Sequence, residues 1–383
     1  MASARAFVEE LLKKADVTIG GSRPQDIVVH DERLFNRVIR YGTLGLGEAY
    51  MDGWWDANAL DVFFHTVLAA RLDKAIAINF ASVLTIARAF LFNLQAGKNA
   101  FTVGEVHYDL GNDLYSAMLD SRMTYTCGYW SSNPQQTTLD DAQEAKLDLV
   151  CKKIGLSAGG GSASGGKRIR ILDIGCGWGS FAKFAAEKYG ASVVGITVSK
   201  EQAELARKLC AGLPIEIRVQ DYREVNEPFD HIVSIGMFEH VGVKNYRDYF
   251  KVANRCLKDD GLFLLHTIGY TRSQVGSDPW INKYIFPGGQ LPSVAQIGKA
   301  IEGLFIVEDL HNFGVDYDTT LMAWFRNFDA AWPKLKGKYG ERFYRMWTYY
   351  LLSCAGVFRA REAQLWQIVL SKDGALGGYR SVR

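Results

Sequence analysis

From residue 169 onward, short apolar runs alternate with segments whose apolar residues recur at helical spacing. Ile169, Ile171 and Ile174 suit a buried parallel strand, because both faces of such a strand are covered. Further apolar runs span residues 192–197, 214–220, 231–236 and 261–269, and helical segments begin near residues 200 and 245. This alternation predicts a Rossmann-like α/β fold with a mostly parallel central sheet and helices on both faces. A cofactor would then bind at the carboxyl ends of the strands.

The first hundred residues have a mostly helical pattern and show no strand-like alternation. Trp54 and Trp55 lie there in a loop-like GWWD segment. The length of the chain also favours more than one domain. We therefore predict a small, mainly helical domain at residues 1–101, followed by a catalytic domain at residues 102–383.

Residues 75–94 are apolar and long enough to be compared with a membrane span. Their apolar residues recur at helical spacing, but Asn79, Thr85 and Arg88 interrupt the run. The pattern therefore predicts a docked or interfacial helix and not a span. Two interpretations stay open, which are packing against protein and contact with lipid.

A glycine-rich turn follows the strand near residue 174. Asp173 precedes Gly175, Gly177 and Gly179, and an amphipathic helical segment comes next. Glycine lacks a Cβ atom, so this backbone can turn sharply and pass close beneath a bound nucleotide. Dinucleotide enzymes use the spacing G-x-G-x-x-G. The shorter G-x-G-x-G spacing favours S-adenosylmethionine over NAD.

The amino-acid composition limits the classes of function that the chain can have. A chain of 383 residues with 48% hydrophobic residues can bury a sizeable core. Lys and Arg total 44 against 42 for Asp and Glu, which gives no electrostatic case for nucleic-acid binding. The six cysteines form no C-x-x-C pair or zinc-like cluster, and the first residues lack a secretory-signal pattern. We expect no metal, reduced thiols and a cytoplasmic protein.

The strings DIGCGWG at 173–179 and VVGITVSKEQ at 193–202 resemble the cyclopropane fatty-acid synthases, which are S-adenosylmethionine-dependent methyltransferases. The segment at 42–56 also resembles the front part of the bacterial phospholipid-acting members, so the resemblance covers nearly the whole chain. Its other motifs are HYDLGNDLY at 107, MTYTCGYW at 123, SIGMFEHVG at 234, LLHTIG at 264, DPWINKYIFPGG at 278, HNFGVDYDTTLMAW at 311 and SCAGVFRARE at 353. The resemblance implies a class I methyltransferase domain with a front domain before it.

The resemblance also implies which residues hold S-adenosylmethionine. The turn after the first strand, with Tyr125 and Thr126, would bind the methionine end of the cofactor. Thr197 and Gln202 would bind the ribose, and the region around residue 221 would bind the adenine. An alternative to ribose binding is that the hydroxyl of Thr197 makes a hydrogen bond with the nearby backbone at the end of its strand. The predicted cofactor-binding residues are Tyr125, Thr126, Asp173, Gly175, Cys176, Gly177, Trp178, Thr197, Gln202, Asp221 and Tyr222.

A cyclopropane synthase must let a cis double bond attack the methyl group and must then remove a proton from that carbon. A carbocation lies between the two steps, so the site has to exclude water. In the resembling enzymes a bound bicarbonate ion is the base, and its contacts map here onto Cys127, Glu239, His266, the backbone of Ile268 and Tyr317. Glu239 would accept hydrogen bonds from bicarbonate and orient it through His266.

Cys354 is a catalytic candidate by resemblance alone. Attack of an alkene on a sulfonium needs no enzyme nucleophile, and the local sequence offers no base beside the thiol. A cysteine between Ser353 and Ala355 in a helix is more typical of a small core residue.

We therefore expect transfer of a methylene group from S-adenosylmethionine to the unsaturated acyl chains of membrane phospholipids. The protein would bind the membrane surface transiently, and the front domain would contact lipid and help to form a homodimer. Two alternatives stay open: methyl transfer without ring closure, and a lipid-binding protein without turnover.

Overall fold

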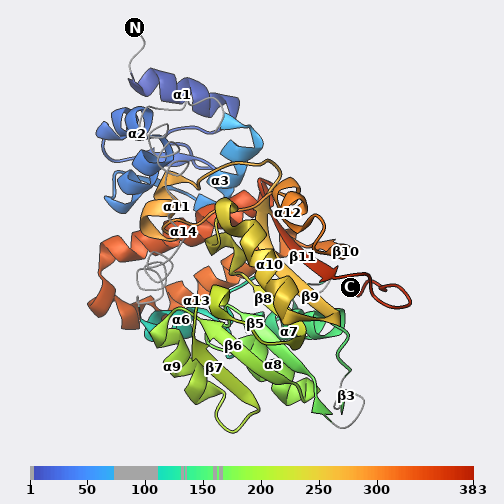
Figure 1. Cartoon of the computed structure of the whole chain (residues 1–383). Helices are drawn as coiled ribbons and strands as arrows, with labels where there is room; N and C mark the ends of the chain where they lie inside the picture. The colour runs from blue at the N-terminus through green and yellow to red at the C-terminus, as the bar shows by residue number, and fades with distance from the viewer. Residues whose placement is uncertain (1–3, 73–110, 131–132, 134–135, 158–161, 164–166) are drawn as a thin grey trace. The chain divides into compact units, whose positions relative to one another are not determined.

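The computed structural model describes residues 4–72, 111–130, 133, 136–157, 162–163 and 167–383, which form two compact units (Figure 1). The front unit combines the described residues up to 72 with residues 275–288 and 317–363. The sheet unit combines the described residues from 111 to 274 with residues 289–316 and 364–383. The predicted domain boundary after residue 101 and the predicted helix at 75–94 lie outside the described residues and stay predictions.

A seven-stranded sheet with the order β10-β11-β9-β8-β5-β6-β7 forms the centre of the sheet unit. The strands are β5 (Arg170–Ile174), β6 (Ser192–Thr197), β7 (Ile215–Val219), β8 (Phe229–Ile235), β9 (Leu257–Tyr270), β10 (Ile306–Asn312) and β11 (Ala363–Ser371). Strands β5 to β9 pair in parallel, whereas β10 and β11 are antiparallel. The predicted α/β fold with a mostly parallel sheet is confirmed. The strand order reverses at β5, which is where such folds bind ligands.

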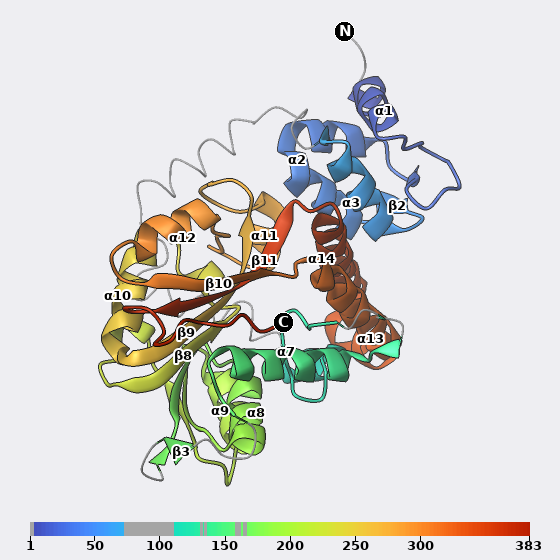
Figure 2. The same ribbon diagram turned by 90° about the vertical axis from the view of Figure 1, so that its right-hand side faces the viewer.

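Helices cover both faces of this sheet (Figure 2). On one face, Phe181 and Ala185 of α8 pack with Ile171 and Val193 of the strands, as the apolar pattern predicts. On the other face, α10 and α12 pack on strand residues such as Phe263. The helices of the unit are α6 (Asn112–Met118), α7 (Leu139–Lys153), α8 (Ser180–Tyr189), α9 (Lys200–Leu209), α10 (Tyr246–Cys256) and α12 (Val294–Ile301). Shorter elements are the 3-10 turns η3 (Tyr222–Glu224), η4 (Phe238–His240) and η5 (Val243–Asn245) and the antiparallel pair of strands β3 (Ser162–Ala163) and β4 (Lys167–Arg168).

The front unit is mainly helical, as predicted. Its helices are α1 (Ala4–Lys14), α2 (Arg33–Met51), α3 (Leu60–Ala69), α11 (Pro279–Tyr284), α14 (Glu341–Arg359) and most of α13 (Val315–Tyr339). The region also contains two short strands, β1 (Ile27–Val29) and β2 (Trp55–Ala57), which pair antiparallel. Strands of three residues are too short to produce a recognisable alternation of apolar and polar positions.

Trp55 anchors the core of the front unit and begins β2, although its sequence context is loop-like. Its side chain is fully buried, and its Nε1 donates to the carbonyl oxygen of Leu46 at 3.0 Å. The rings of Tyr50 and Phe63 pack on it, each with a centroid separation of 5.3 Å. Trp54 is half-buried, and the guanidinium groups of two arginines lie 4.6 Å and 4.7 Å from its ring centroid.

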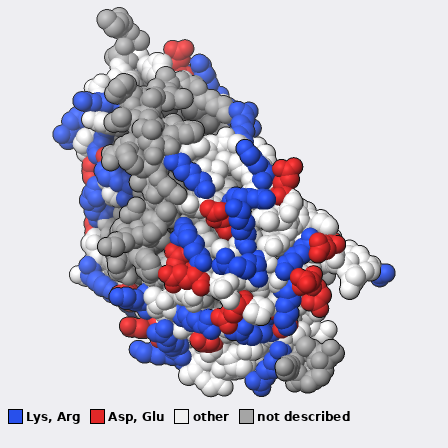
Figure 3. Space-filling view, in the orientation of Figure 1, with Lys and Arg blue, Asp and Glu red and all other residues white. Residues whose placement is uncertain are grey.

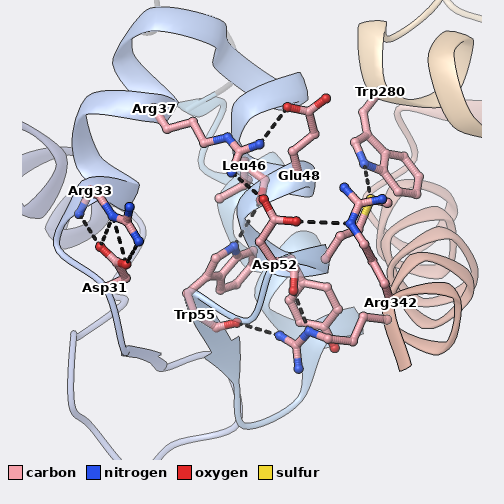
Figure 4. A network of polar contacts seen from close by, with 12 residues as sticks. Asp31, Arg33, Arg37, Leu46, Glu48, Asp52, Trp55, Trp280 and Arg342 are labelled. Atoms are coloured by element: carbon pink, nitrogen blue, oxygen red, sulfur yellow. Dashed lines mark hydrogen bonds and ion pairs between the residues drawn. The ribbon is translucent and has the colours of Figure 1, made fainter. Parts of the chain in front are cut away.

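Ion pairs fasten α2 to segments that come from much later in the chain (Figure 4). Arg37 pairs with Glu48 and Asp52 of the same region, and Arg342 of α14 also pairs with Asp52. Lys283 of α11 donates to Glu48 at 2.6 Å. The front unit is therefore a compact structure made from three separate stretches of sequence.

The burial of Trp55 leads to a stability prediction. Trp55→Ala should lower the free energy of unfolding of the front unit by about 3–5 kcal/mol, because it removes a fully buried aromatic ring and leaves a cavity. Trp54→Ala is the matched control and should cost less, about 1–2 kcal/mol, because it removes two cation–π contacts of about 0.5–1 kcal/mol each. Thermal unfolding followed by circular dichroism measures both variants. Equal shifts for the two substitutions would contradict the assignment of Trp55 to the core.

Candidate active site

The glycine turn connects β5 to α8 and is pinned to the neighbouring strand. The backbone N–H groups of Gly175 and Cys176 both donate to the carbonyl oxygen of Ile196, at 2.9 Å and 3.0 Å. Gly175 has a φ of +85°, and a Cβ atom there would lie 2.6 Å from the side chain of Met237. Gly177 has a φ of +54°, with open space where a Cβ atom would stand. The turn therefore requires glycine for its backbone conformation and leaves room above it for a ligand.

A cavity opens at the carboxyl ends of β5, β6 and β8, beside this turn. All the residues that the sequence predicts for cofactor binding line it, namely Tyr125, Thr126, Asp173, Gly175, Cys176, Gly177, Trp178, Thr197, Gln202, Asp221 and Tyr222. The structure thus brings this whole set together in one place. Contact of each residue with a cofactor stays a prediction.

Trp178 and Tyr125 are held in place by α6. The indole Nε1 of Trp178 donates to the side chain of Asn112 at 3.0 Å. The ring of Tyr115 lies against both aromatic residues, with centroid separations of 4.9 Å to Trp178 and 5.2 Å to Tyr125. These contacts set the aromatic wall of the cavity before any ligand binds.

Polar side chains at the end of β6 hold one another in position. The hydroxyl of Thr197 donates to Oε1 of Gln202 at 3.0 Å and accepts from the backbone N–H of Ser199. Ser199 caps α9 by accepting from the backbone N–H of Gln202. Thr197 therefore makes the local backbone contact considered as its alternative role and still faces the cavity, where it can meet ribose hydroxyls.

The cavity also contains Lys146, which the sequence analysis missed. Lys146 is fully buried on α7, and its Nζ donates to Oγ1 of Thr126 at 2.8 Å. Gln143 donates to the backbone carbonyl oxygen of Thr126 at 2.7 Å, so α7 holds this residue at two points. A signal for Lys146 exists in the sequence, because it occupies the same stripe of α7 as the buried residues Leu139, Ala142, Leu149 and Val150.

Asp173 is a second charged group under the cavity. Its side chain is 2% exposed, and Oδ2 has no hydrogen-bond partner among the described residues. Burial raises the pKa of Asp173 to about 7, and the charge of Lys146 opposes this rise. Burial lowers the pKa of Lys146 to about 8. A lysine and a carboxyl group under one cavity complement the carboxylate and the ammonium group of an amino-acid ligand.

Two of the predicted catalytic residues are sequence neighbours of residues that line the cavity. Cys127 follows Thr126, and Glu239 precedes His240, another lining residue. Glu239 lies on η4, and its Oε1 accepts from the backbone N–H of Ile268 at 2.7 Å. His266 lies two residues earlier on β9 and is 1% exposed. The sheet unit thus contains four of the predicted catalytic residues, with a direct contact between Glu239 and Ile268.

Two polar atoms of these four residues are buried without a partner among the described residues, Oε2 of Glu239 and Nε2 of His266. Burying such groups unpaired costs about 1–3 kcal/mol each, which points to a polar ligand. Burial raises the pKa of Glu239 to about 7, while the N–H of Ile268 opposes this rise. Burial, aided by the charges of Lys146 and Lys153, keeps the pKa of His266 well below its usual value. His266 is therefore neutral and can donate one hydrogen bond.

Tyr317 and Cys354 belong to the front unit. The Tyr317 ring is buried and packs on Phe358 with a centroid separation of 4.5 Å. Cys354 is a half-buried residue of α14, and burial raises the pKa of its thiol to about 12. A thiol that resists ionisation is a poor nucleophile.

No group of three or more potential metal-ligating side chains occurs within the part of the chain that the structure describes. None of the described helices is long and apolar enough to cross a membrane.

The family model described as Mycolic acid cyclopropane synthetase matches residues 95–368. The chain is 54% identical over 377 residues to the cyclopropane-fatty-acyl-phospholipid synthase of Escherichia coli, covering 98% of this chain and 95% of that protein. It also resembles the solved structure of the cyclopropane synthase MmaA2 from Mycobacterium tuberculosis, with a TM-score of 0.65 and 31% identity, covering 71% of this chain and 98% of that one. A mycolic acid cyclopropane synthase, CmaA1, solved with SAH and CTAB, has a TM-score of 0.64 and 32% identity, with 71% and 98% covered. Together with the glycine turn and its cavity, these similarities show that the chain belongs to the cyclopropane synthase family.

Proposed function

We propose that this protein transfers a methylene group from S-adenosylmethionine to the cis double bond of unsaturated phospholipid acyl chains, with bound bicarbonate as the base that completes the ring. The observation that carries the proposal is the pair of buried, unpartnered atoms on Glu239 and His266 beside the glycine-lined cavity. The 54% identity to a cyclopropane-fatty-acyl-phospholipid synthase over nearly the whole chain supports the substrate class.

S-adenosylmethionine supplies an electrophilic methyl group, and the residues of the cavity suit its parts. The positive charge of Lys146 and the N–H and O–H groups of Thr126 suit the carboxylate of the methionine end. Asp173 offers a carboxyl group to the ammonium. Thr197 and Gln202 offer hydroxyl and amide groups to the ribose. Lys146 is mostly protonated below a pH of about 8, and the hydroxyl, amide and carboxyl groups of this set are weak nucleophiles, so the chain competes little with the alkene for the methyl group.

Bicarbonate would supply the base that accepts the proton, a role that we do not assign to a side chain of the protein. His266 is neutral and can donate one N–H to an oxygen of the anion, and Glu239 has an oxygen free to meet its hydroxyl group. Because both side chains are buried, a small anion held between them is kept from water. The family resemblance also assigns Cys127 and Tyr317 to the anion, and we propose no covalent role for Cys354.

The front unit carries exposed apolar side chains that suit transient contact with a membrane. Phe7 of α1 and Ile39 and Tyr41 of α2 are large apolar residues that are 41–43% exposed. Lys13 and Lys14 lie in the last turn of α1 and can attract anionic lipid headgroups. Elsewhere, positive and negative side chains are interspersed over the face seen in Figure 3, so a local patch is needed for such attraction. Dimer formation stays a prediction.

Removal of bicarbonate tests the proposed base. In buffer freed of carbon dioxide, the rate on unsaturated phospholipid vesicles should fall and should recover when bicarbonate is added back. Mass spectrometry should identify a cyclopropane product. A methyl-branched or methylene product would favour the alternative without ring closure. Full activity in a verified carbonate-free sample would remove bicarbonate as an exchangeable base.

Glu239→Gln separates this role from cofactor binding. The substitution keeps the size of the side chain but changes its charge and hydrogen bonding, so turnover should fall by roughly 100-fold or more. Affinity for S-adenosylhomocysteine, measured by calorimetry, should stay within about threefold, because Glu239 does not line the cofactor cavity. Unchanged turnover would exclude Glu239 from the mechanism.

Lys146→Met tests the methionine end of the cavity. Loss of the charge and of the bond to Thr126 should weaken binding of S-adenosylhomocysteine by about tenfold, or about 1.4 kcal/mol. Lys153→Met is the matched control, because Lys153 is equally buried on the same helix but pairs with Asp309 at 3.3 Å and does not line the cavity. Its dissociation constant should match that of the unaltered protein. If both variants bind equally well, Lys146 has no part in cofactor binding.

The lipid-facing patch is tested by substituting Phe7, Ile39 and Tyr41 together with Ser. Co-sedimentation with anionic phospholipid vesicles should decrease several-fold, because the apolar area available to the bilayer is reduced. The control replaces Ile306 and Val307, which are 47% and 48% exposed on the sheet unit, with Ser. It should sediment normally. Normal sedimentation of the triple variant would refute this patch as the membrane contact.

A further inference from the structure

The ring of His266 is held from the side opposite to its unpartnered Nε2. Gln367 of β11 places its Nε2 at 3.3 Å from Nδ1 of His266. β11 and β9 are neighbours in the sheet, and both side chains are essentially fully buried. Gln367 therefore meets His266 inside the protein, where water does not compete for the contact.

A glutamine in this position is unusual for its surroundings. All nine residues of β11 are buried, and Trp366 and Ile368 flank Gln367 with apolar side chains. An amide buried in such a strand is costly unless it is hydrogen-bonded. Only the nitrogen of this amide is bonded within the described residues, to His266, whereas Oε1 of Gln367 is buried there without a partner.

The chemistry of the pair determines where the proton of His266 lies. His266 is neutral, so one ring nitrogen carries hydrogen and the other accepts. The amide of Gln367 donates to Nδ1, and Nδ1 must then be the acceptor. The hydrogen lies on Nε2, which is the buried atom without a partner.

We propose that Gln367 is a positioning residue that fixes His266 in the tautomer with hydrogen on Nε2, so that His266 presents a neutral N–H donor to an anion beside Glu239. The inference rests on the proposed function for the identity of that anion as bicarbonate. A carboxylate in place of the amide would accept from Nδ1 instead, and Nε2 would then face the anion with a lone pair or as part of an imidazolium. An amide avoids both outcomes, because it stays uncharged and can donate.

The first experiment reads the tautomer directly. Nitrogen NMR of the full chain labelled with 15N-histidine, with His266 assigned by comparison with His266→Asn, should show hydrogen on Nε2. In Gln367→Glu the signals should change to those of the Nδ1–H tautomer or of the imidazolium. Gln367→Met, which keeps the volume and removes the donor, should lose the strong preference for Nε2. Hydrogen on Nδ1 in the unaltered protein, or an unchanged tautomer in both variants, would overturn the proposal.

The second experiment measures the consequence for the anion. Where NMR shows the Nδ1–H tautomer in Gln367→Glu, Nε2 faces the anion with a lone pair, so the bicarbonate concentration needed for half-maximal turnover should rise by about tenfold or more. The dissociation constant for S-adenosylhomocysteine should not change. Gln364→Glu is the matched control, because Gln364 is buried on the same strand but accepts from Asn312 at 3.0 Å. It should alter neither the tautomer nor the bicarbonate dependence.

These two readouts separate failure of the inference from failure of the proposed function. If the unaltered protein does not respond to bicarbonate, the proposed base is wrong, yet the tautomer measurement still decides the role of Gln367. If bicarbonate acts as proposed and Gln367→Glu leaves both readouts unchanged, Gln367 only fills space in the sheet.

Discussion

Two hydrogen bonds to one carbonyl oxygen, from the N–H groups of Gly175 and Cys176 to Ile196, determine where the candidate site forms. They hold the turn after β5 against the adjacent strand, at the point where the strand order reverses. The cavity lining, the start of α8 and the approach of Met237 to Gly175 all depend on the position of this turn. A side chain at position 175 would both strain the backbone and displace Met237, so this position requires glycine.

Desolvation is the dominant electrostatic effect around this turn. It raises the pKa of Asp173 and of Glu239 and lowers that of Lys146, and in each case it outweighs the opposing contacts. Such a site holds its polar groups in a water-poor environment before the ligands arrive. Arranged dipoles and charges of this kind can stabilise developing charge without reorganising. The same dryness suits a reaction that water would divert through its carbocation.

Local sequence patterns predicted the sheet unit well. The strands and the glycine turn could be predicted because buried parallel strands and left-handed turns restrict the residues that they accept. Lys146 was missed, since a lysine in a helix is ordinarily read as a solvent-exposed residue, although its place in a buried stripe identifies it. Gln367 was missed for a related reason, because only the pairing of β11 with β9 brings it to His266. Tyr317 and Cys354 were predicted from the family resemblance alone. No local sequence pattern indicates that their segment folds together with the first residues of the chain.

The discontinuous front unit has a consequence for synthesis of the protein on the ribosome. Helix α3 packs on α14 so closely that a Cβ atom at Gly356 would lie 2.6 Å from Phe64. The first 72 residues therefore emerge long before the helix that completes their core. At about 5–20 residues per second, the delay is roughly 15–60 s. Throughout that interval the apolar face of α3 lacks its partner, so the nascent chain needs shielding from aggregation until its last third has been made.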